Sequence, residues 1–468
     1  MRRVVVIGGG ISGLAAAHRL IELDPSLNLT LIEASGRVGG TLLTDEREGF
    51  LLERGPDSFI TEKPEAVALA KRLGLESRLI ETNPNHRRAF IVRKGRLRPV
   101  PEGFQLLAPS RIWPFLTTDI FSFMGKVRMA GDLVLPRRTT NGSSDESLAN
   151  FVRRRLGREA LERMAQPMVG GIYTADPETL SLRATLPRFL DMERDHGSVV
   201  LAMLRKARAN KKTDQSGTSG ARYGLFLSFD RGMEVLVRAL EQALAHIEIN
   251  VNTQVQSITR NSATWTIHLS SGQTLEADAI CLAVPPYVAA QLLSSVNPSL
   301  TAQLKQIKYA STATINLAYR RDAIEHPLDG FGFVVPFVEK RSVIACTFSS
   351  VKFPGRAPGD HVLLRAFAGG ALQPDMFSLD DSEMLVRVER DLRELLKITS
   401  QPLFAEVSKW QNSMPQYEVG HLERVAAIEN AVRELPGLTL AGNAYRGTGI
   451  PDCIRSGETA AEYLSQLT

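Results

Sequence analysis

The residues best suited to chemistry are glycines at a fixed spacing near the N-terminus, followed by a carboxylate. Directly after a β-branched run at residues 4–7, the sequence continues with Gly8, Gly9, Gly10, Ile11, Ser12 and Gly13. In such a GxGxxG loop the first glycine permits a tight turn, the second lets the backbone approach a pyrophosphate, and the third lets helix and strand pack closely. Glu33 follows Gly13 by twenty residues, where a carboxylate can bind both hydroxyls of a ribose. The spacing predicts a dinucleotide site.

The elements that must position these residues follow the Rossmann order of strand, helix and strand. Residues 4–7 predict a buried parallel strand, 14–23 a helix and 29–32 a second strand that ends at Glu33. The helix N-terminus is expected to face the phosphates. Later segments predict a helix over 234–244, a final helix through 464, and strands over 247–251, 253–258, 263–269, 278–285 and 438–443, the last running into a turn. Cys281, on one of these strands, is expected to fill the core.

The segment after the second strand favours a flavin over a nicotinamide cofactor. It consists of Ala34, Ser35, Gly36, Arg37, Val38, Gly39, Gly40 and Thr41. With Glu33, this stretch resembles the E-A-x-x-R-x-G-G segment of the flavin-containing amine oxidase and porphyrinogen oxidase superfamily, where it lies along FAD. The resemblance implies that Arg37 and the backbone of Gly39 and Gly40 lie near the pyrophosphate, a role that suits a planar side chain with five donors.

The same resemblance implies further FAD contacts far along the chain. Val255 stands where the superfamily places a residue on the adenine, and residues 449–454 begin a helix that lies beside the flavin ring in that superfamily. Asn443 stands where relatives often carry an acid, which leaves its ribitol contact in doubt. The remaining positions implied to bind the cofactor are Gly55, Pro56, Asp57, Ser58, Trp410, Gly442, Gly449, Ile450 and Pro451.

Four segments narrow the resemblance to the protoporphyrinogen and coproporphyrinogen oxidases of haem synthesis. They are residues 53–59, 166–182, 329–336 and 410–417, and the likeness runs through essentially the whole chain. Taken without the family, each segment predicts only a loop between strands, with aromatic residues packed beneath it. The resemblance implies FAD-dependent oxidation of a porphyrinogen to the porphyrin.

That reaction requires a flat, apolar slot beside the flavin, with polar groups near the substrate carboxylates. Phe331, Gly170 and Gly171 suit the slot, and the resemblance implies that Arg93 pairs with a propionate through two parallel hydrogen bonds. The alternative for Arg93 is a solvated hairpin charge. We hypothesise hydride transfer from a meso carbon to the flavin, proton loss, and reoxidation by O2 with release of H2O2, in three rounds. No side chain stands out as a catalytic acid or base.

The predicted fold class is α/β plus α+β, with three parts. A discontinuous Rossmann-type FAD domain, of the amine oxidase kind, takes residues 1–86, 224–298 and 416–468. A mixed-sheet substrate domain takes 87–100 and 299–415, with a helix over 382–396 outside the sheet. Residues 101–223 form a helical insert.

The insert carries features with more than one interpretation. Apolar and aromatic residues gather between 104 and 124, followed by Lys126, Arg128, Arg137 and Arg138. This pattern fits an ordinary helical core, or an amphipathic surface for a membrane or a haem-pathway partner such as a ferrochelatase-like enzyme. Ser147 is expected to cap a helix through residue 156, with residues 153–155 on a solvated face. Residues 206–220 predict a mobile loop.

Composition excludes several classes of protein. The 468 residues carry a net charge of +5, and the basic residues are spread without interleaved aromatics, which argues against a nucleic-acid partner. Three separated cysteines predict neither disulfides nor a metal site. Without a signal peptide or a spanning run, we expect a cytoplasmic protein, with peripheral contact at the inner membrane face as an option. The oligomeric state stays open.

Two other classes of function share part of the pattern. An amine oxidase or carotenoid desaturase would have the same flavin segments, and a flavin-binding haem-pathway partner would lack turnover. Between the two porphyrinogens, the likeness to soluble bacterial enzymes favours coproporphyrinogen III. Its four propionates would suit extra cations, for which Lys94, Arg96 and Arg98 are candidates.

Overall fold

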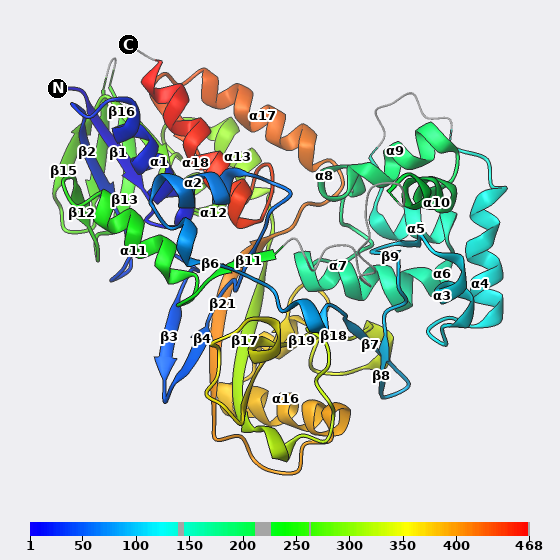
Figure 1. Cartoon of the computed structure of the whole chain (residues 1–468). Coiled ribbons are helices and arrows are strands. Elements are labelled where there is room, and N and C mark those ends of the chain that lie inside the picture. Colours follow the sequence, from blue (N-terminus) through cyan, green and yellow to red (C-terminus); the bar gives the residue numbers. More distant parts are fainter. Residues whose placement is uncertain (139–144, 211–225, 262–263, 467–468) are drawn as a thin grey trace.

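The computed structural model describes residues 1–138, 145–210, 226–261 and 264–466. Figure 1 shows three regions: a parallel sheet with its helices at the upper left, a sheet of long strands at the lower centre, and a group of helices at the right. Both chain ends lie in the first region. The chain therefore enters and leaves through the same part of the molecule.

A five-stranded parallel sheet forms the core of the first region. Its order is β12 (Glu248–Asn250), β2 (Asn28–Ile32), β1 (Arg3–Ile7), β16 (Ala279–Leu282) and β22 (Leu438–Leu440). The strands β2, β1, β16 and β22 are largely apolar because they are covered on both faces, whereas the edge strand β12 is partly exposed. The parallel strands predicted from the sequence are confirmed.

Helices cover both faces of this sheet. On one face lie α1 (Ile11–Leu23), α18 (Ile450–Ser465), α11 (Glu234–Ala243) and α2 (Glu65–Arg72). On the other lie α12 (Pro286–Leu292), α13 (Pro298–Lys305), α17 (His421–Arg433) and an antiparallel sheet of β13 (Val255–Arg260), β14 (Trp265–Leu269) and β15 (Thr274–Ala277). Helix α1 begins three residues earlier than predicted, because Gly10 is its N-cap.

The second region is a seven-stranded mixed sheet. Its order is β21 (Phe404–Pro415), β17 (Tyr309–Arg320), β20 (His361–Gly369), β19 (Ala345–Phe348), β18 (Gly332–Val334), β7 (Phe90–Arg93) and β8 (Arg96–Pro99). All neighbours are antiparallel except β18 and β7. Helix α16 (Asp381–Leu396) packs on it and is capped by Asp380, which confirms the predicted helix.

The third region is a cluster of helices with its own apolar core. It contains α3 (Ile112–Thr117), α4 (Phe123–Ala130), α5 (Leu148–Arg155), α6 (Arg158–Ala160), α7 (Gln166–Tyr173), α8 (Leu182–Thr185), α9 (Pro187–His196) and α10 (Val199–Asn210), with a π-helical turn at Leu161–Ala165. The Ser147 hydroxyl accepts a hydrogen bond from the Asn150 amide, which confirms the predicted cap.

Short elements connect the regions. They are β3 (Thr44–Arg47), β4 (Phe50–Glu53), β5 (Phe59–Ile60), β6 (Leu79–Glu81), β9 (Phe104–Gln105), β10 (Ala108–Pro109), β11 (Phe226–Phe229), α14 (Ser349–Lys352) and α15 (Pro374–Ser378). Among the described residues, no helix combines the length and the apolar content needed to span a bilayer.

Two predictions for the insert were wrong. Arg155 does not belong to a solvated face: it is buried and donates to Asp132 Oδ1 at 2.5 Å, and its guanidinium also binds the carbonyls of Pro136 and Gly197. An inward-facing carboxylate compensates its charge. The helix α10 extends to Asn210, so the first five residues of the predicted loop at 206–220 are helical, as alanine and basic side chains favour. Residues 211–220 lie outside the described residues.

The apolar cluster between residues 104 and 124 divides between two surroundings. Phe104, Leu106, Leu107, Phe115, Ile120 and Phe121 are buried in the insert core. Ile112, Trp113, Leu116, Phe123 and Met124 are exposed. The core interpretation is correct for the buried residues, and the membrane or partner surface stays a prediction for the exposed ones.

Candidate active site

The glycine loop lies between β1 and α1 and requires glycine at its two ends. Gly8 has φ of 106°, and a Cβ there would lie 2.4 Å from the Ala283 carbonyl oxygen. A Cβ on Gly13 would lie 1.9 Å from the carbonyl oxygen of Gly8. A Cβ on Gly10 would meet no atom within 4 Å. The loop is therefore tight against the sheet but open on the side of Gly10.

Glu33 holds this loop from the end of β2. One carboxylate oxygen accepts from the Gly9 amide at 2.7 Å, and the other accepts from the amide and the hydroxyl of Ser35 at 2.8 and 2.7 Å. The oxygen that accepts from Gly9 has a further lone pair for a ribose hydroxyl. The backbone of residues 252 and 253 pairs with residues 33–35, which brings the nearby Val255 to the same edge.

The double glycine packs directly against the glycine loop. The Gly39 amide donates to the Gly9 carbonyl at 2.7 Å, and Gly10 and Gly39 form a parallel bridge. The Arg37 guanidinium donates to the carbonyls of Val38 and Leu42 at 2.9 and 3.1 Å, and also to that of Gly40. The Arg37 side chain thus holds the backbone of residues 38–42, which include Thr41. That Arg37 lies near the pyrophosphate stays a prediction.

A second helix N-terminus faces the site from the C-terminal end of the chain. Gly449 is the N-cap of α18, which Ile450 and Pro451 begin. A Cβ on Gly442 would meet no atom within 4 Å. Asp452, in the first turn, accepts from the Lys63 ammonium at 2.5 and 2.6 Å and forms an ion pair with Arg455.

The helices α1 and α18 share a property that suits a charged ligand. Each has glycine as its N-cap, and neither has a side chain that hydrogen-bonds to its first turn from that position. Free amide groups and the positive ends of two helix dipoles favour phosphates and electron-rich rings. Together with the open space at Gly10 and Gly442, the residues fit a dinucleotide of the FAD type.

Two buried cations, which the sequence analysis missed, hold residues 55–58 from the side of the mixed sheet. Lys352, on α14, donates to both Asp57 oxygens at 3.1 and 3.0 Å and to the Ser58 hydroxyl at 3.1 Å. Arg365, on β20, donates to the Gly55 carbonyl at 3.0 Å. Burial opposes ionisation of Asp57, but the charges of Lys352 and Arg365 hold its pKa well below its usual value.

Neighbouring side chains extend this support. The Trp410 indole N–H donates to the Arg54 carbonyl at 2.9 Å, directly before Gly55. Glu53 is buried on β4, where burial raises its pKa to about 7. Pro56 lies between the two anchored positions Gly55 and Asp57. The mixed sheet thus holds the backbone at Arg54 and Gly55, and Lys352 holds the side chains of Asp57 and Ser58.

The positions predicted for the substrate lie where the insert meets the mixed sheet. Gly170 borders a cavity of about 20 Å³, lined also by Thr174, Val335, Ile344 and Leu372. A Cβ on Gly171 would lie 3.6 Å from the Val334 side chain, so α7 approaches β18 closely. Phe331 is buried directly before β18, and its amide donates to the Arg88 carbonyl at 2.8 Å.

Arg93 ends β7 at the side of the insert. Its side chain is 16% exposed and its guanidinium lies 3.8 Å from the Glu159 carboxylate, so it is not a solvated hairpin charge. Arg98 forms an ion pair with Asp119 at 3.1 Å, whereas Lys94 and Arg96 are exposed at the hairpin. Of the candidate cations, Arg93 is the one most shielded from solvent.

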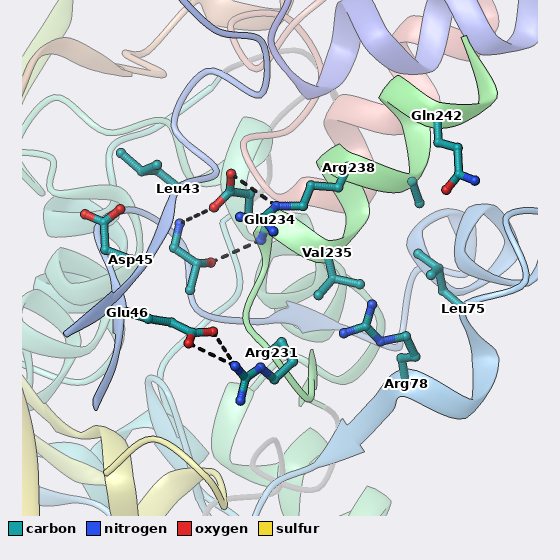
Figure 2. A pocket seen from close by; sticks show the side chains of 12 residues that line it. Leu43, Asp45, Glu46, Leu75, Arg78, Arg231, Glu234, Val235, Arg238 and Gln242 are labelled. Atoms are coloured by element: carbon teal, nitrogen blue, oxygen red, sulfur yellow. Dashed lines mark hydrogen bonds and ion pairs between the residues drawn. The ribbon is translucent and has the colours of Figure 1, made fainter. Parts of the chain in front are cut away.

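A separate groove of about 720 Å³ lies between β3 and α11 (Figure 2). Four of its charged side chains pair within the groove, Glu46 with Arg231 and Glu234 with Arg238. Asp45 and Arg78 pair with Arg54 and Asp230 outside it. None of the residues predicted to bind cofactor or substrate lines it. Its lining is Leu43, Thr44, Asp45, Glu46, Leu75, Arg78, Arg231, Glu234, Val235, Arg238, Ala239 and Gln242.

Other titratable groups are structural. Within the described ranges, no group of three or more His, Cys, Asp or Glu side chains is placed to hold a metal ion. All three cysteines are buried, and burial raises the pKa of the Cys281 thiol to about 11. The predicted role of Cys281 as core filler is confirmed.

The fold and the site define an FAD-dependent oxidoreductase, in which a Rossmann-type sheet, two uncapped helix N-termini and an anchored flavin segment face a mixed sheet. The model of the family of flavin containing amine oxidoreductases matches residues 11–465, and the chain belongs to this family. The cofactor of this family is a flavin, and here it is FAD.

Relatives place the chain more narrowly. A coproporphyrinogen III oxidase of Bacillus subtilis is 36% identical over 468 residues, covering 98% of this chain and 97% of the relative. A chloroplastic protoporphyrinogen oxidase of Nicotiana tabacum is 32% identical, covering 99% and 85%. A crystal structure from Exiguobacterium sp. 255-15 has a TM-score of 0.88 and 32% identity, covering 100% of this chain and 99% of that one. The chain belongs with the porphyrinogen oxidases of the family.

We expect His421 to make the unfolding free energy of the protein depend on pH. It is buried at the start of α17, and burial lowers its pKa to about 4. Because the folded-state pKa lies below the unfolded value of about 6.5, the stabilisation is present above pH 6.5 and is lost as the pH falls toward 4. Between pH 7 and 4, we expect the free energy of unfolding to fall by about 3 kcal/mol more in the natural protein than in His421→Gln. Urea unfolding at several pH values measures this difference, and parallel curves for the two proteins would contradict it.

Proposed function

We propose that this chain oxidises a porphyrinogen to the porphyrin in haem biosynthesis, using FAD and O2, with coproporphyrinogen III as the substrate. The observation that carries the proposal is an FAD site built from both ends of the chain, in a protein that matches coproporphyrinogen III oxidases over nearly its full length. The amine oxidase and desaturase alternatives have no comparable support among these relatives.

The chemistry of the proposal balances in three equal rounds. Bound FAD would supply a two-electron acceptor, so that in each round two electrons and two protons would pass from the porphyrinogen to O2, giving H2O2. The residues of the chain bind and orient the two partners. Helices α1 and α18 hold the cofactor, the residues at 55–58 support its ring, and α7 and β18 form the opposite wall.

Turnover of the purified holoenzyme tests the proposal. With coproporphyrinogen III, porphyrin fluorescence should rise and three H2O2 should form per porphyrin, at a higher rate than with protoporphyrinogen IX. A faster reaction with protoporphyrinogen IX would overturn the choice of substrate. A flavin that neither porphyrinogen reduces would favour the non-catalytic partner, and reduction by amines alone would favour an amine oxidase.

Arg93 is proposed to pair with a propionate of the substrate. We expect Arg93→Ala to raise the apparent KM about tenfold or more with a smaller change in kcat, because a charge-assisted hydrogen bond contributes about 1.5–3 kcal/mol. The matched control is Arg96→Ala, which removes an exposed arginine from the same hairpin. Steady-state kinetics measure both, and an unchanged KM in Arg93→Ala would contradict the contact.

We also propose that the outer surface of the insert binds anionic membranes peripherally, at the cytoplasmic face. Helices α3 and α4 lie at the edge of the molecule farthest from the parallel sheet (Figure 1). Trp113 is 75% and Phe123 is 78% exposed, and Arg111 and Lys126 flank them. Apolar side chains beside cations are the composition that binds a lipid interface. The exposed apolar residues of this surface are Ile112, Trp113, Leu116, Phe123, Met124 and Val127.

Co-sedimentation with vesicles tests this surface. The protein should bind vesicles rich in phosphatidylglycerol and bind neutral ones weakly. Trp113→Glu with Phe123→Glu should lower the partition at least tenfold, because burying one large apolar side chain contributes about 1.5–3 kcal/mol. Absence of binding to anionic vesicles would overturn the proposal and favour a protein partner for the surface.

A further inference from the structure

The segment 416–421 connects the helical insert to the flavin side of the molecule. On the insert side its hydrogen bonds are made by the backbone, and the Tyr417 ring packs in the insert core. The Tyr417 carbonyl accepts from the Ser181 amide at 2.8 Å, the Val419 amide donates to the Thr179 carbonyl at 2.9 Å, and the Gly420 amide donates to Asp145 at 3.0 Å. The insert thus holds residues 417–420, and Lys308 holds the start of the segment through the Gln416 amide at 2.8 Å.

The side chains of the same segment hold the loop between β22 and α18. The Tyr417 hydroxyl donates to the Asn443 carbonyl at 2.6 Å and accepts from the Gly447 amide at 2.7 Å. The His421 ring stacks on the Tyr417 ring with centroids 3.9 Å apart and donates from Nε2 to the Tyr445 carbonyl at 3.0 Å. Two side chains therefore fix three backbone groups within five residues.

The loop they hold leads directly to the flavin. It begins after Gly442, where a Cβ would meet open space. It ends before Gly449, the N-cap residue of α18, which has no side chain to bind the amides of the first turn. A displacement of the loop moves the α18 N-terminus, whose free amides and dipole are aimed at the cofactor. Tyr417 is 2% exposed, so water cannot replace its hydroxyl without a structural change.

We propose that Tyr417 is a positioning residue for the flavin, which sets the α18 N-terminus against FAD from a segment fixed by the helical insert. Within Tyr417 the hydroxyl makes both contacts with the loop, whereas the ring packs in the insert core and on His421, which makes the third contact. The inference rests on FAD binding and is independent of the identity of the substrate. It also implies that the insert, which borders the proposed substrate slot, and the flavin loop move together.

Tyr417→Phe tests the hydroxyl while keeping the ring. We expect FAD to leave the diluted holoenzyme about tenfold faster, as followed by free FAD fluorescence, and the visible absorption band of the bound flavin to shift. The matched control is Tyr319→Phe, which changes another buried tyrosine, on β17 within the core of the mixed sheet. The melting temperature of each apoprotein records the structural cost separately.

The outcomes are separable. Faster release with a changed flavin spectrum in Tyr417→Phe, and neither in Tyr319→Phe, supports the proposal. The proposal is overturned if Tyr417→Phe releases FAD at the rate of the natural protein with an unchanged flavin spectrum. It is also overturned if both variants change equally. If Tyr417→Phe does not fold, His421→Leu removes the donor to Tyr445 from the same loop, and there an unchanged release rate overturns the proposal. Because none of these measurements uses a porphyrinogen, their failure is distinct from failure of the proposed reaction.

Discussion

The Lys352→Met variant is expected to lose about 3–5 kcal/mol of unfolding free energy, the usual cost of removing one partner of a buried ion pair. The side chains of Lys352 and Asp57 are each 12% exposed, and their closest contact is 3.0 Å. In the variant, Asp57 would keep only Arg365, at 3.7 Å, as a compensating cation. Methionine fills a similar volume, so the loss reports the charge and not a cavity.

The effect should reach the cofactor as well as the fold. Asp57 and Ser58 belong to the predicted flavin segment, so loosening them should weaken FAD binding together with stability. Urea unfolding of apoprotein and holoenzyme measures both. The double variant Lys352→Met with Asp57→Asn should recover part of the lost stability, since it leaves no buried charge uncompensated. A loss below about 1 kcal/mol in Lys352→Met would mean that water or Arg365 compensates Asp57.

Gly13→Ala is expected to damage both the fold and the cofactor site. The added Cβ would lie 1.9 Å from the Gly8 carbonyl oxygen and 3.2 Å from the Ala283 side chain. With the Gly8 backbone on one side and Ala283, directly after β16, on the other, α1 can only move away from the sheet. We expect a loss of about 1–3 kcal/mol in stability from this overpacking. FAD affinity should fall at least tenfold, because the α1 N-terminus would leave its position.

Gly10→Ala provides the contrasting control. A Cβ at Gly10 meets no atom of the chain within 4 Å. The apoprotein of the variant should therefore have the same urea unfolding midpoint as the natural apoprotein. The methyl group would nevertheless occupy space that the pyrophosphate needs, and FAD affinity should fall as far as in Gly13→Ala. Titration of the apoproteins with FAD and urea unfolding separate the two effects. If Gly10→Ala binds FAD normally, the phosphates do not lie against this part of the loop.

Several features of this protein follow from the sequence because they depend on local backbone geometry. The turn at Gly8, the helix that starts after Gly10 and the acid at Glu33 are close along the chain. Their spacing is dictated by the strand and helix that carry them. The same holds for the cap Ser147, whose hydroxyl accepts from the amide of Asn150, three residues on. Such signals need no knowledge of the rest of the fold.

Other features appeared only in tertiary structure. Lys352 meets Asp57 across 295 positions of sequence, and Arg365 meets Gly55 across 310. Nothing in the residues around either cation distinguishes it from a surface charge. Arg155, in a run of three arginines, turned inward because Asp132 is buried opposite it. Burying a charge costs free energy unless an opposite charge lies beside it in the core. That partner comes from another part of the chain, so the local sequence does not reveal it.

Sequence alone thus determines the part of the dinucleotide site that consists of the glycine loop and Glu33, because these residues lie close together along the chain. Tertiary structure decided the rest of the site, since α18, the 55–58 segment and Tyr417 converge only through packing of the three regions. It also decided which apolar residues of the insert are core and which are surface. Periodicity and composition are the same for both, and burial depends on which neighbour covers a side chain.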